Sequence, residues 1–366
     1  MKKQISFVLE CIHKLGGTEK ATIDLANLLA KNGYKVSIVS LYKNISKEAN
    51  SYYLNPFIEI KYVYKSFPFL KFHLNVYRFL DFISKRKVYE KVKKLKPDIV
   101  FFTDIKQIPF KSSKFKKILM VHNSYEHYRS GRLTRKLLDA HYKEIDKVIF
   151  LSKEDLKKYT IDFSADNGEF VYNISQIKPC IRTNFNNKRI VYFGRLENKQ
   201  KQIDHAIKIV EKLVKKKVFD GWEFHIYGSG PDREVIKNLI VEKKLEKIII
   251  LKGTTSEVEK VLGNSDIMIL TSDYEGLPMS LLEGASSGLS LVSYDTSPGI
   301  HDIIIDNFNG YIIEKNNIEF FTEKIIHLIS NIELRKEFGK NGVKHIKENF
   351  SDEKIFNKWV YILKNI

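Results

Sequence analysis

Short apolar runs alternate with longer amphipathic stretches along most of this 366-residue chain, and this alternation constrains the fold more than any other feature. Each apolar run has the length of a buried strand, and the stretches between runs are long enough to form helices. Such alternation is typical of βαβ units, whose parallel strands share one sheet covered by helices. We therefore predict an α/β chain built on parallel sheets.

The alternation occurs in two blocks. The segment 172–187 (YNISQIKPCIRTNFNN) has no periodicity and separates them, as a linker would. Since a domain typically holds about 100–200 residues, the length fits two domains. We predict doubly wound domains over 1–180 and 188–349, facing each other across a cleft at the carboxyl ends of their strands. The predicted strands are 4–9, 35–41, 58–63, 98–102, 117–122 and 147–151, then 189–193, 223–227, 247–251, 266–271 and 290–294.

The composition fits a globular protein that needs no disulfide bonds to fold. Hydrophobic residues make up 43% of the chain, enough for a sizeable core. Cys11 and Cys180 belong to no metal-binding or redox motif, which suits a reducing compartment and predicts no metal site. The apolar stretch 5–12 contains Glu10, so we expect a first strand rather than a signal peptide. No apolar run approaches the length of a transmembrane helix.

Positive charge is concentrated in one part of the chain. The formal net charge is +18, and residues 61–117 contribute +12 of it, with 16 basic and 4 acidic residues. From Leu74 onward this part has helical length and an amphipathic pattern, with most cations between Lys85 and Lys94. The pattern fits a surface helix on anionic lipid, and equally the solvated face of an ordinary helix. Nucleic acid is disfavoured because no binding motif accompanies the charge.

The segment 273–288 (DYEGLPMSLLEGASSG) carries the strongest chemical signal, because it directly follows the predicted strand 266–271. Pro278 suits a first helical turn and Gly288 a C-terminal cap, which predicts a short helix over about 278–287. The free amides at the start of such a helix favour an anion such as a diphosphate.

Two glutamates flank the start of that helix, Glu275 just before it and Glu283 within it. A carboxylate accepts two hydrogen bonds and so suits vicinal sugar hydroxyls. Glutamates are common on surfaces, so the pair alone is a weak signal. The neighbouring amides, around Leu277 and Met279, strengthen it.

Two further elements follow predicted strands. Gly194 and Arg195 follow the strand 189–193, and Lys201 comes six residues after Arg195. The planar guanidinium fork and the mobile ammonium together hold phosphate oxygens well, although solvated surface is the simpler interpretation of these residues alone. Gly16 and Gly17 follow the first strand and allow either close approach of a ligand or a tight turn.

Together these elements resemble the retaining GT-B glycosyltransferases of family 4, and the resemblance covers nearly the whole chain. The elements stand in the family's order. The matching residues are Gly16, Gly17 and Glu19 for the GGxE loop, His122 for the strand-end histidine, Gly194, Arg195 and Lys201 for the GRL...K element, and Glu275 and Glu283 for the E-x7-E element.

The resemblance implies two facing Rossmann-like domains and a C-terminal helix, near 350–366, that crosses back onto the N-terminal domain. Trp359 and Ile362 would be the core contacts of this helix. The resemblance also implies front-face displacement with retention, a nucleotide-sugar donor as substrate, and no cofactor or obligate metal.

The resemblance also assigns roles to single residues. Arg195 and Lys201 would neutralise the donor diphosphate, and Glu283 would hold the ribose. Glu275 and the amides of Gly276, Leu277 and Met279 would hold the transferred sugar and the distal phosphate. Gly17, beside Gly16, would approach that phosphate, and His122 would contact the sugar near the anomeric centre.

The sequence departs from the family pattern in two places. Lys201 lies one residue further from Arg195 than is usual, so Lys199 is an alternative phosphate ligand. In the element Asp306 to Gly310 (DNFNG), Asn307 stands where the family has glycine, and Asp302 stands where many members have Glu.

We therefore expect a glycosyltransferase at the cytoplasmic face of the membrane. It would move a hexose or N-acetylhexosamine from a UDP-linked donor to a surface polysaccharide, lipid-linked oligosaccharide or lipopolysaccharide. The helix around Lys85 to Lys94 would bind the anionic inner leaflet near a lipid-anchored acceptor. The alternatives are a nucleotide-sugar 2-epimerase of the same architecture and a non-catalytic protein that binds sugar nucleotides.

Overall fold

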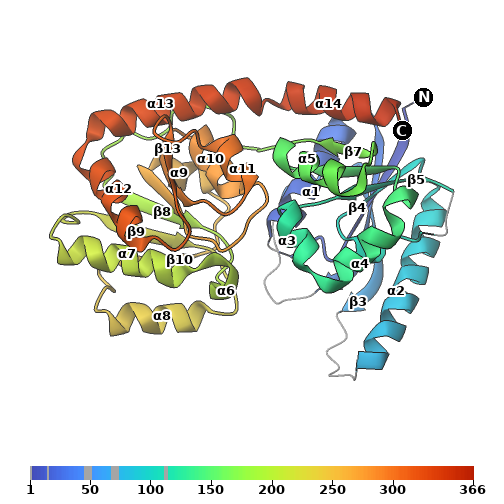
Figure 1. Cartoon of the computed structure of the whole chain (residues 1–366), viewed down its shortest axis with the longest axis horizontal. Coiled ribbons are helices and arrows are strands. Elements are labelled where there is room, and N and C mark those ends of the chain that lie inside the picture. The colour runs from blue at the N-terminus through green and yellow to red at the C-terminus, as the bar shows by residue number, and fades with distance from the viewer. Residues whose placement is uncertain (1, 15, 45–51, 67–73, 111–113) are drawn as a thin grey trace. The chain divides into compact units, whose positions relative to one another are not determined.

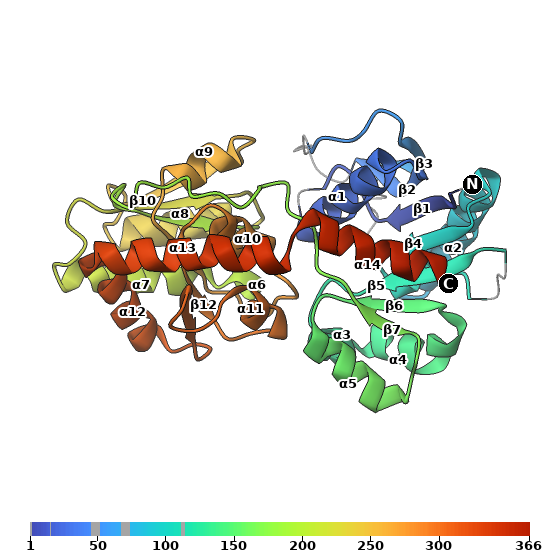
Figure 2. The same ribbon diagram turned by 90° about the horizontal axis from the view of Figure 1, so that it is seen from above.

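The computed structural model describes residues 2–14, 16–44, 52–66, 74–110 and 114–366. The chain divides into two compact units (Figures 1 and 2). The N-terminal unit comprises Met1–Ile174 and Asp352–Ile366, and the C-terminal unit comprises Ser175–Ser351. Each unit is an α/β body with its own parallel sheet, as the alternating pattern predicted.

The sheet of the N-terminal unit has seven parallel strands in the order β3-β2-β1-β4-β5-β6-β7. The order reverses at β1, which makes the sheet doubly wound. Six of the seven strands were predicted; the seventh, β7, is three residues long and pairs at the edge. The strands are β1 Gln4–Leu9, β2 Lys35–Asn44, β3 Glu59–Ser66, β4 Ile99–Phe102, β5 Lys116–Met120, β6 Lys147–Phe150 and β7 Gly168–Phe170.

Helices cover both faces of this sheet, so its central strands are buried throughout and appear as continuous apolar runs. One core cluster joins the sheet to α1 and α14, and a second joins it to α2 through α5. The helices are α1 Gly17–Lys31, α2 Leu74–Leu95, α3 Tyr125–Ser130, α4 Arg132–His141, α5 Lys153–Phe163 and α14 Asp352–Lys364, with short 3-10 turns η1 Ile105–Gln107 and η2 Tyr142–Glu144.

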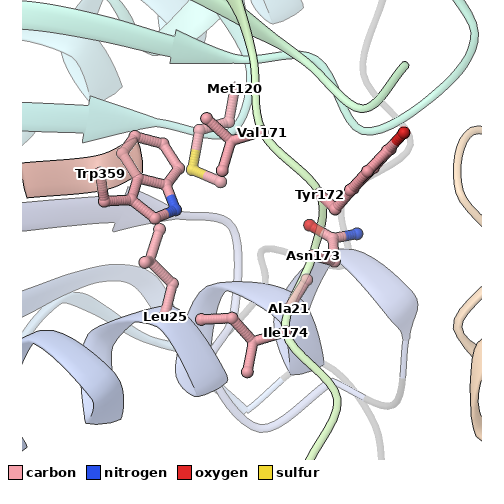
Figure 3. A pocket seen from close by; sticks show the side chains of 8 residues that line it. All are labelled: Ala21, Leu25, Met120, Val171, Tyr172, Asn173, Ile174 and Trp359. Carbon is pink, nitrogen blue, oxygen red and sulfur yellow. The ribbon is translucent and has the colours of Figure 1, made fainter. Parts of the chain in front are cut away.

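The C-terminal helix α14 belongs to the N-terminal unit, as the resemblance implied. Trp359 and Ile362 are almost fully buried, and the Trp359 ring centroid lies 5.3 Å from that of Phe101 in β4. A cavity of about 10 Å³ remains beside Trp359, lined also by Leu25 and Met120 (Figure 3). It has room for about one water molecule, so it is a packing defect rather than a ligand site.

Helix α2 packs apolar side chains against the sheet of the N-terminal unit. Val88 and Val92 are each 1% exposed and pack into the core. Arg86, Lys93 and Lys94 are exposed. Where its side chains are described, the amphipathic pattern of α2 therefore reflects core packing, and the face left to solvent is cationic. No helix in the described ranges is long and apolar enough to cross a membrane.

The sheet of the C-terminal unit has six parallel strands in the order β10-β9-β8-β11-β12-β13. Five were predicted, and β13 was not. The strands are β8 Arg189–Phe193, β9 Glu223–Tyr227, β10 Ile249–Gly253, β11 Ile267–Leu270, β12 Ser290–Tyr294 and β13 Gly310–Ile313, and the helices are α6 Asn198–Lys201, α7 Ile203–Lys215, α8 Arg233–Glu242, α9 Val258–Gly263, α10 Met279–Ser286, α11 Pro298–Ile303, α12 Ile318–Ser330 and α13 Ile332–Asn349.

The segment before β8 has no helix or strand but is held against the C-terminal unit. The Cys180 amide donates to the Ser286 carbonyl over 2.8 Å. The buried Arg335 donates to the Phe185 carbonyl through Nε and Nη2, at 3.2 and 2.8 Å. These bonds satisfy an arginine that is 3% exposed, and they fix the entry of the chain into β8.

Candidate functional site

The parallel pairing of β8 with β11 brings two loops to one edge of the C-terminal sheet. Val191 of β8 lies beside Met268 of β11, so both strands end on the same side. The loops that follow are bonded to each other: the Asp273 amide donates to the Gln200 carbonyl over 2.7 Å. Thr271 Oγ1 also donates to the carbonyl of Lys201 over 3.1 Å.

These bonds place Lys201 beside Glu275. Lys201 Nζ lies 2.6 Å from Glu275 Oε1, and the two side chains are only 15% and 10% exposed. Both charged groups are largely shielded from water, so the loss of either one would leave the other as an unpaired, poorly solvated charge. Lys201 ends the short helix α6, and the next residue, Gln202, has a left-handed backbone with φ of 44° that turns the chain away. Lys199, on the same helix, is exposed.

Arg195 lies at the carboxyl end of β8 with its side chain 47% exposed. Its Nε lies 3.4 Å from Glu197 Oε2, so the guanidinium remains largely accessible to a ligand. The loop after β9 packs closely here, since a Cβ on Gly228 would fall 1.8 Å from the Gly194 carbonyl oxygen. Gly228, with φ of 141°, therefore serves loop packing.

Helix α10 begins at Met279, directly after Pro278, close to the predicted start. Pro278 forms no side-chain cap here, and the first turn holds no acidic residue. Gly276, Leu277 and Met279 lead into the helix, and Ser297 Oγ donates to the Gly276 carbonyl over 2.8 Å. Glu283, on the second turn, is 7% exposed. The amides and the helix dipole favour an anion at this end of α10.

His122 follows β5 in the N-terminal unit. Its Nε2 is shielded from solvent and has no hydrogen-bond partner among the described residues. Burial lowers the pKa of His122 to about 4, so the imidazole is neutral at pH 7. The neutral ring therefore carries one N–H donor and one acceptor nitrogen.

Gly16 and Gly17 lie at the start of α1, after β1. A Cβ on Gly16 would fall 2.3 Å from Glu19 Oε2, so the glycine lets the Glu19 carboxylate fold back over the loop. A Cβ on Gly17 would meet nothing within 4 Å, so this position is open.

The element Asp306 to Gly310 forms a turn into β13. Asn307 has a left-handed backbone with φ of 59°, a conformation that glycine favours and asparagine tolerates. Asn309 Oδ1 accepts from the Ile305 amide over 2.7 Å, and Asp306 Oδ1 accepts from the Ile312 amide over 2.9 Å. The departure from the family glycine therefore preserves the turn.

The ion pair of Lys201 with Glu275 was not predicted, and neither was a second contact at the site. Lys315 Nζ, in the loop after β13, lies 2.6 Å from Asp273 Oδ1 and ties that loop to the one that carries Glu275. No sequence signal links positions so far apart. The described residues contain no cluster of three or more His, Cys, Asp or Glu side chains that could hold a metal ion.

Two family profiles match almost the full chain. The profile described as "Glycosyltransferase Family 4" matches residues 15–173, and the one described as "Glycosyl transferases group 1" matches residues 175–345. The chain belongs to the group 1 glycosyltransferases of family 4. It is a hexosyltransferase of the GT-B fold, which confirms the family that the motifs indicated.

The relatives of this glycosyltransferase agree with that assignment. An uncharacterised glycosyltransferase of Haemophilus influenzae is 29% identical over 99% of this chain and 100% of its own. Poly(ribitol-phosphate) alpha-N-acetylglucosaminyltransferase of Staphylococcus aureus is 31% identical over 67% of this chain and 49% of its own. The S. aureus TarM structure, solved with fondaparinux, alpha-GlcNAc-glycerol and UDP, superposes with a TM-score of 0.82 at 19% identity, over 99% of both chains.

The shielded imidazole of His122 in this glycosyltransferase should resist protonation. We expect its ring nitrogens to remain in the neutral form at pH 5.5 and to titrate near pH 4, because burial penalises the imidazolium. Nitrogen NMR shifts, assigned with a His122→Phe variant, measure this. The unfolded chain binds a proton at the ordinary pKa of 6.5, so this residue should also reduce stability as the pH falls from 6.5 towards 4. A midpoint above pH 6 would contradict the burial argument.

Proposed function

We propose that this glycosyltransferase transfers a hexose or N-acetylhexosamine, with retention, from a UDP-linked donor to a glycan acceptor. The acceptor would be a surface polysaccharide, a lipid-linked oligosaccharide or lipopolysaccharide. The observation that carries the proposal is the shielded pair of Lys201 and Glu275 in the loop that leads into α10, whose preceding Pro278 forms no side-chain cap. The S. aureus relative that acts on poly(ribitol phosphate) and the UDP in the TarM structure support it.

The donor diphosphate would lie between the start of α10 and the two cations. Arg195 and Lys201 would neutralise it, and opposite charges about 4 Å apart gain roughly 1–4 kcal/mol at effective dielectric constants of 80 to 20. Negative charge grows on the leaving phosphate oxygen as the glycosidic bond breaks, so the cations stabilise the transition state more than the ground state. In this proposal they take the place of a divalent metal ion, and no cofactor is needed.

The carboxylates would hold the two sugars. Glu283 would accept from the ribose hydroxyls, while Glu275 and the amides of Gly276, Leu277 and Met279 would hold the transferred sugar and the distal phosphate. From the N-terminal unit, Gly17 beside Gly16 would approach that phosphate through its backbone. Neutral His122 would contact a sugar hydroxyl near the anomeric carbon, since its Nε2 has no other described partner.

The acceptor hydroxyl would attack the anomeric carbon from the face that the diphosphate leaves. Its proton passes to the leaving phosphate oxygen, which balances the step and preserves the anomeric configuration. The cations at Arg195 and Lys201 stabilise the departing diphosphate while the new bond forms.

The exposed cationic face of α2 would bind the inner leaflet of the plasma membrane. Arg86, Lys93 and Lys94 are exposed on it, and its described apolar residues are engaged in the core. Binding would therefore be electrostatic and reversible, at the cytoplasmic surface.

Donor hydrolysis tests the donor site without an acceptor. With a panel of UDP, GDP and ADP sugars, we expect slow release of UDP and no free C2 epimer. Lys201→Ala should reduce this rate by about 10²–10³, the cost of removing one donor to a developing oxyanion. The matched Lys199→Ala, on the same helix but exposed, should stay within about 3-fold.

Two controls separate chemistry from folding. Thermal unfolding of Lys201→Ala shows whether the fold is destabilised when Glu275 loses its ion-pair partner. Lys201→Arg should restore part of the rate of donor hydrolysis. Equal losses in the two alanine variants, or a larger loss in Lys199→Ala, would refute the assignment of Lys201. Accumulation of a C2 epimer would identify an epimerase instead.

Vesicle co-sedimentation tests the face of α2. At about 1 kcal/mol for each cation near an anionic surface, a variant with Arg86, Lys93 and Lys94 changed to Ala should bind anionic vesicles up to about 100-fold more weakly. The wild-type protein should bind neutral vesicles poorly. Equal binding to neutral and anionic vesicles would overturn the proposal.

A further inference from the structure

Helix α4 carries a row of cations that the fold does not neutralise. Arg132, Arg135 and Lys136 are exposed, and none of their side chains has a hydrogen bond or ion pair within the described part of the chain. The one carboxylate on this helix is Asp139, which lies three and four residues after Lys136 and Arg135. Asp139 instead pairs with Arg129 of α3. The row therefore has no counter-charge among the residues that the structure describes.

These charges oppose the helix that bears them. They lie in the first half of α4, whose first turn has no acidic residue and whose preceding Gly131 forms no side-chain cap. Cations at a helix N-terminus are destabilising, and so are like charges three and four positions apart. Packing holds the helix in place despite this, since Leu138 is fully buried and the His141 ring stacks on Phe110 at 4.0 Å. The three cations therefore destabilise the helix and make no stabilising contact in the described structure, which indicates that they bind a ligand.

The row lies towards the edge of the sheet where His122 is found. Helices α3 and α4 together connect β5 to β6, and α4 packs against η1, which follows β4. Because α4 leads towards the amino end of β6, its first turn lies nearer the carboxyl edge. His122 follows β5 at that edge.

We propose that Arg132, Arg135 and Lys136 bind phosphodiester groups of an anionic acceptor chain. The proposal rests on the proposed glycosyl transfer and adds the chemical class of acceptor. The three cations follow one face of α4, separated along its axis by about 1.5–6 Å, and so form a linear array suited to a linear polyanion. Two of them are arginines, whose planar fork bonds phosphate oxygens in pairs.

A lipid surface fits α4 less well than a polymer. An interfacial helix needs an exposed apolar face, whereas α4 exposes one large apolar side chain, Leu133, at 50%. Its other leucines, Leu137 and Leu138, pack into the core.

The test compares two variants of the full chain with the same change in charge. One changes Arg132, Arg135 and Lys136 to Ala on α4, and the other changes Arg86, Lys93 and Lys94 to Ala on α2. Fluorescence anisotropy measures binding of a labelled ribitol-phosphate oligomer, with neutral dextran as the control ligand. We expect the α4 variant to bind the oligomer at least 10-fold more weakly and the α2 variant to change less than 2-fold.

Two further readouts keep the outcomes distinct. The α4 variant should retain its melting temperature or gain a few degrees, since it loses repulsive charges, and its release of UDP without acceptor should be unchanged. A loss of that release would count against the donor site rather than the acceptor surface. If both variants bound the oligomer equally weakly, the loss of binding would follow from net charge alone, and the proposal would be overturned. So would loss of anionic-vesicle binding by the α4 variant with oligomer binding intact.

Discussion

The parallel pairing of β8 with β11 is the constraint on which the candidate donor site depends. It makes the two strands end at one edge, so that a loop ending in Lys201 meets a loop containing Glu275, 74 positions later. Backbone bonds between the loops then hold the ion pair where it is shielded from water. In such surroundings an ammonium is most effective towards a phosphate, because little solvent competes with it. The pair with Glu275 keeps this cation in place before any donor binds.

In the N-terminal unit, two helices have an apolar side that packs into the core and a cationic side that faces solvent. Helices α2 and α4 each place leucines or valines against the sheet and direct cations outward. On α2 the exposed side chains that the structure describes are basic apart from Glu90, which suits a diffuse anionic surface. On α4 it is a short row near the carboxyl edge of the sheet. The same surplus of positive charge therefore supports two proposed contacts, one with a membrane and one with an acceptor.

The sequence predicted most of the strands, because buried parallel strands are nearly continuous apolar runs. It missed β7 and β13, each of three or four residues, since so short a run carries little periodic signal. The helix α10 was predicted from Pro278 and the strand before it. The amphipathic pattern of α2 was predicted, but its described apolar face packs against the sheet. The sequence could not distinguish Lys199 from Lys201, because that difference arises from burial against a distant loop. Nor could it reveal that Asp139 pairs with Arg129.

The central claim is that Lys201 acts on the donor diphosphate. Calorimetric titration of UDP and UMP tests it directly, because the two ligands differ by the phosphate that this cation would hold. The account predicts that UDP binds at least 10-fold more tightly than UMP to the wild-type protein and to Lys199→Met. In Lys201→Met this preference should largely disappear. An unchanged preference in Lys201→Met would contradict the account.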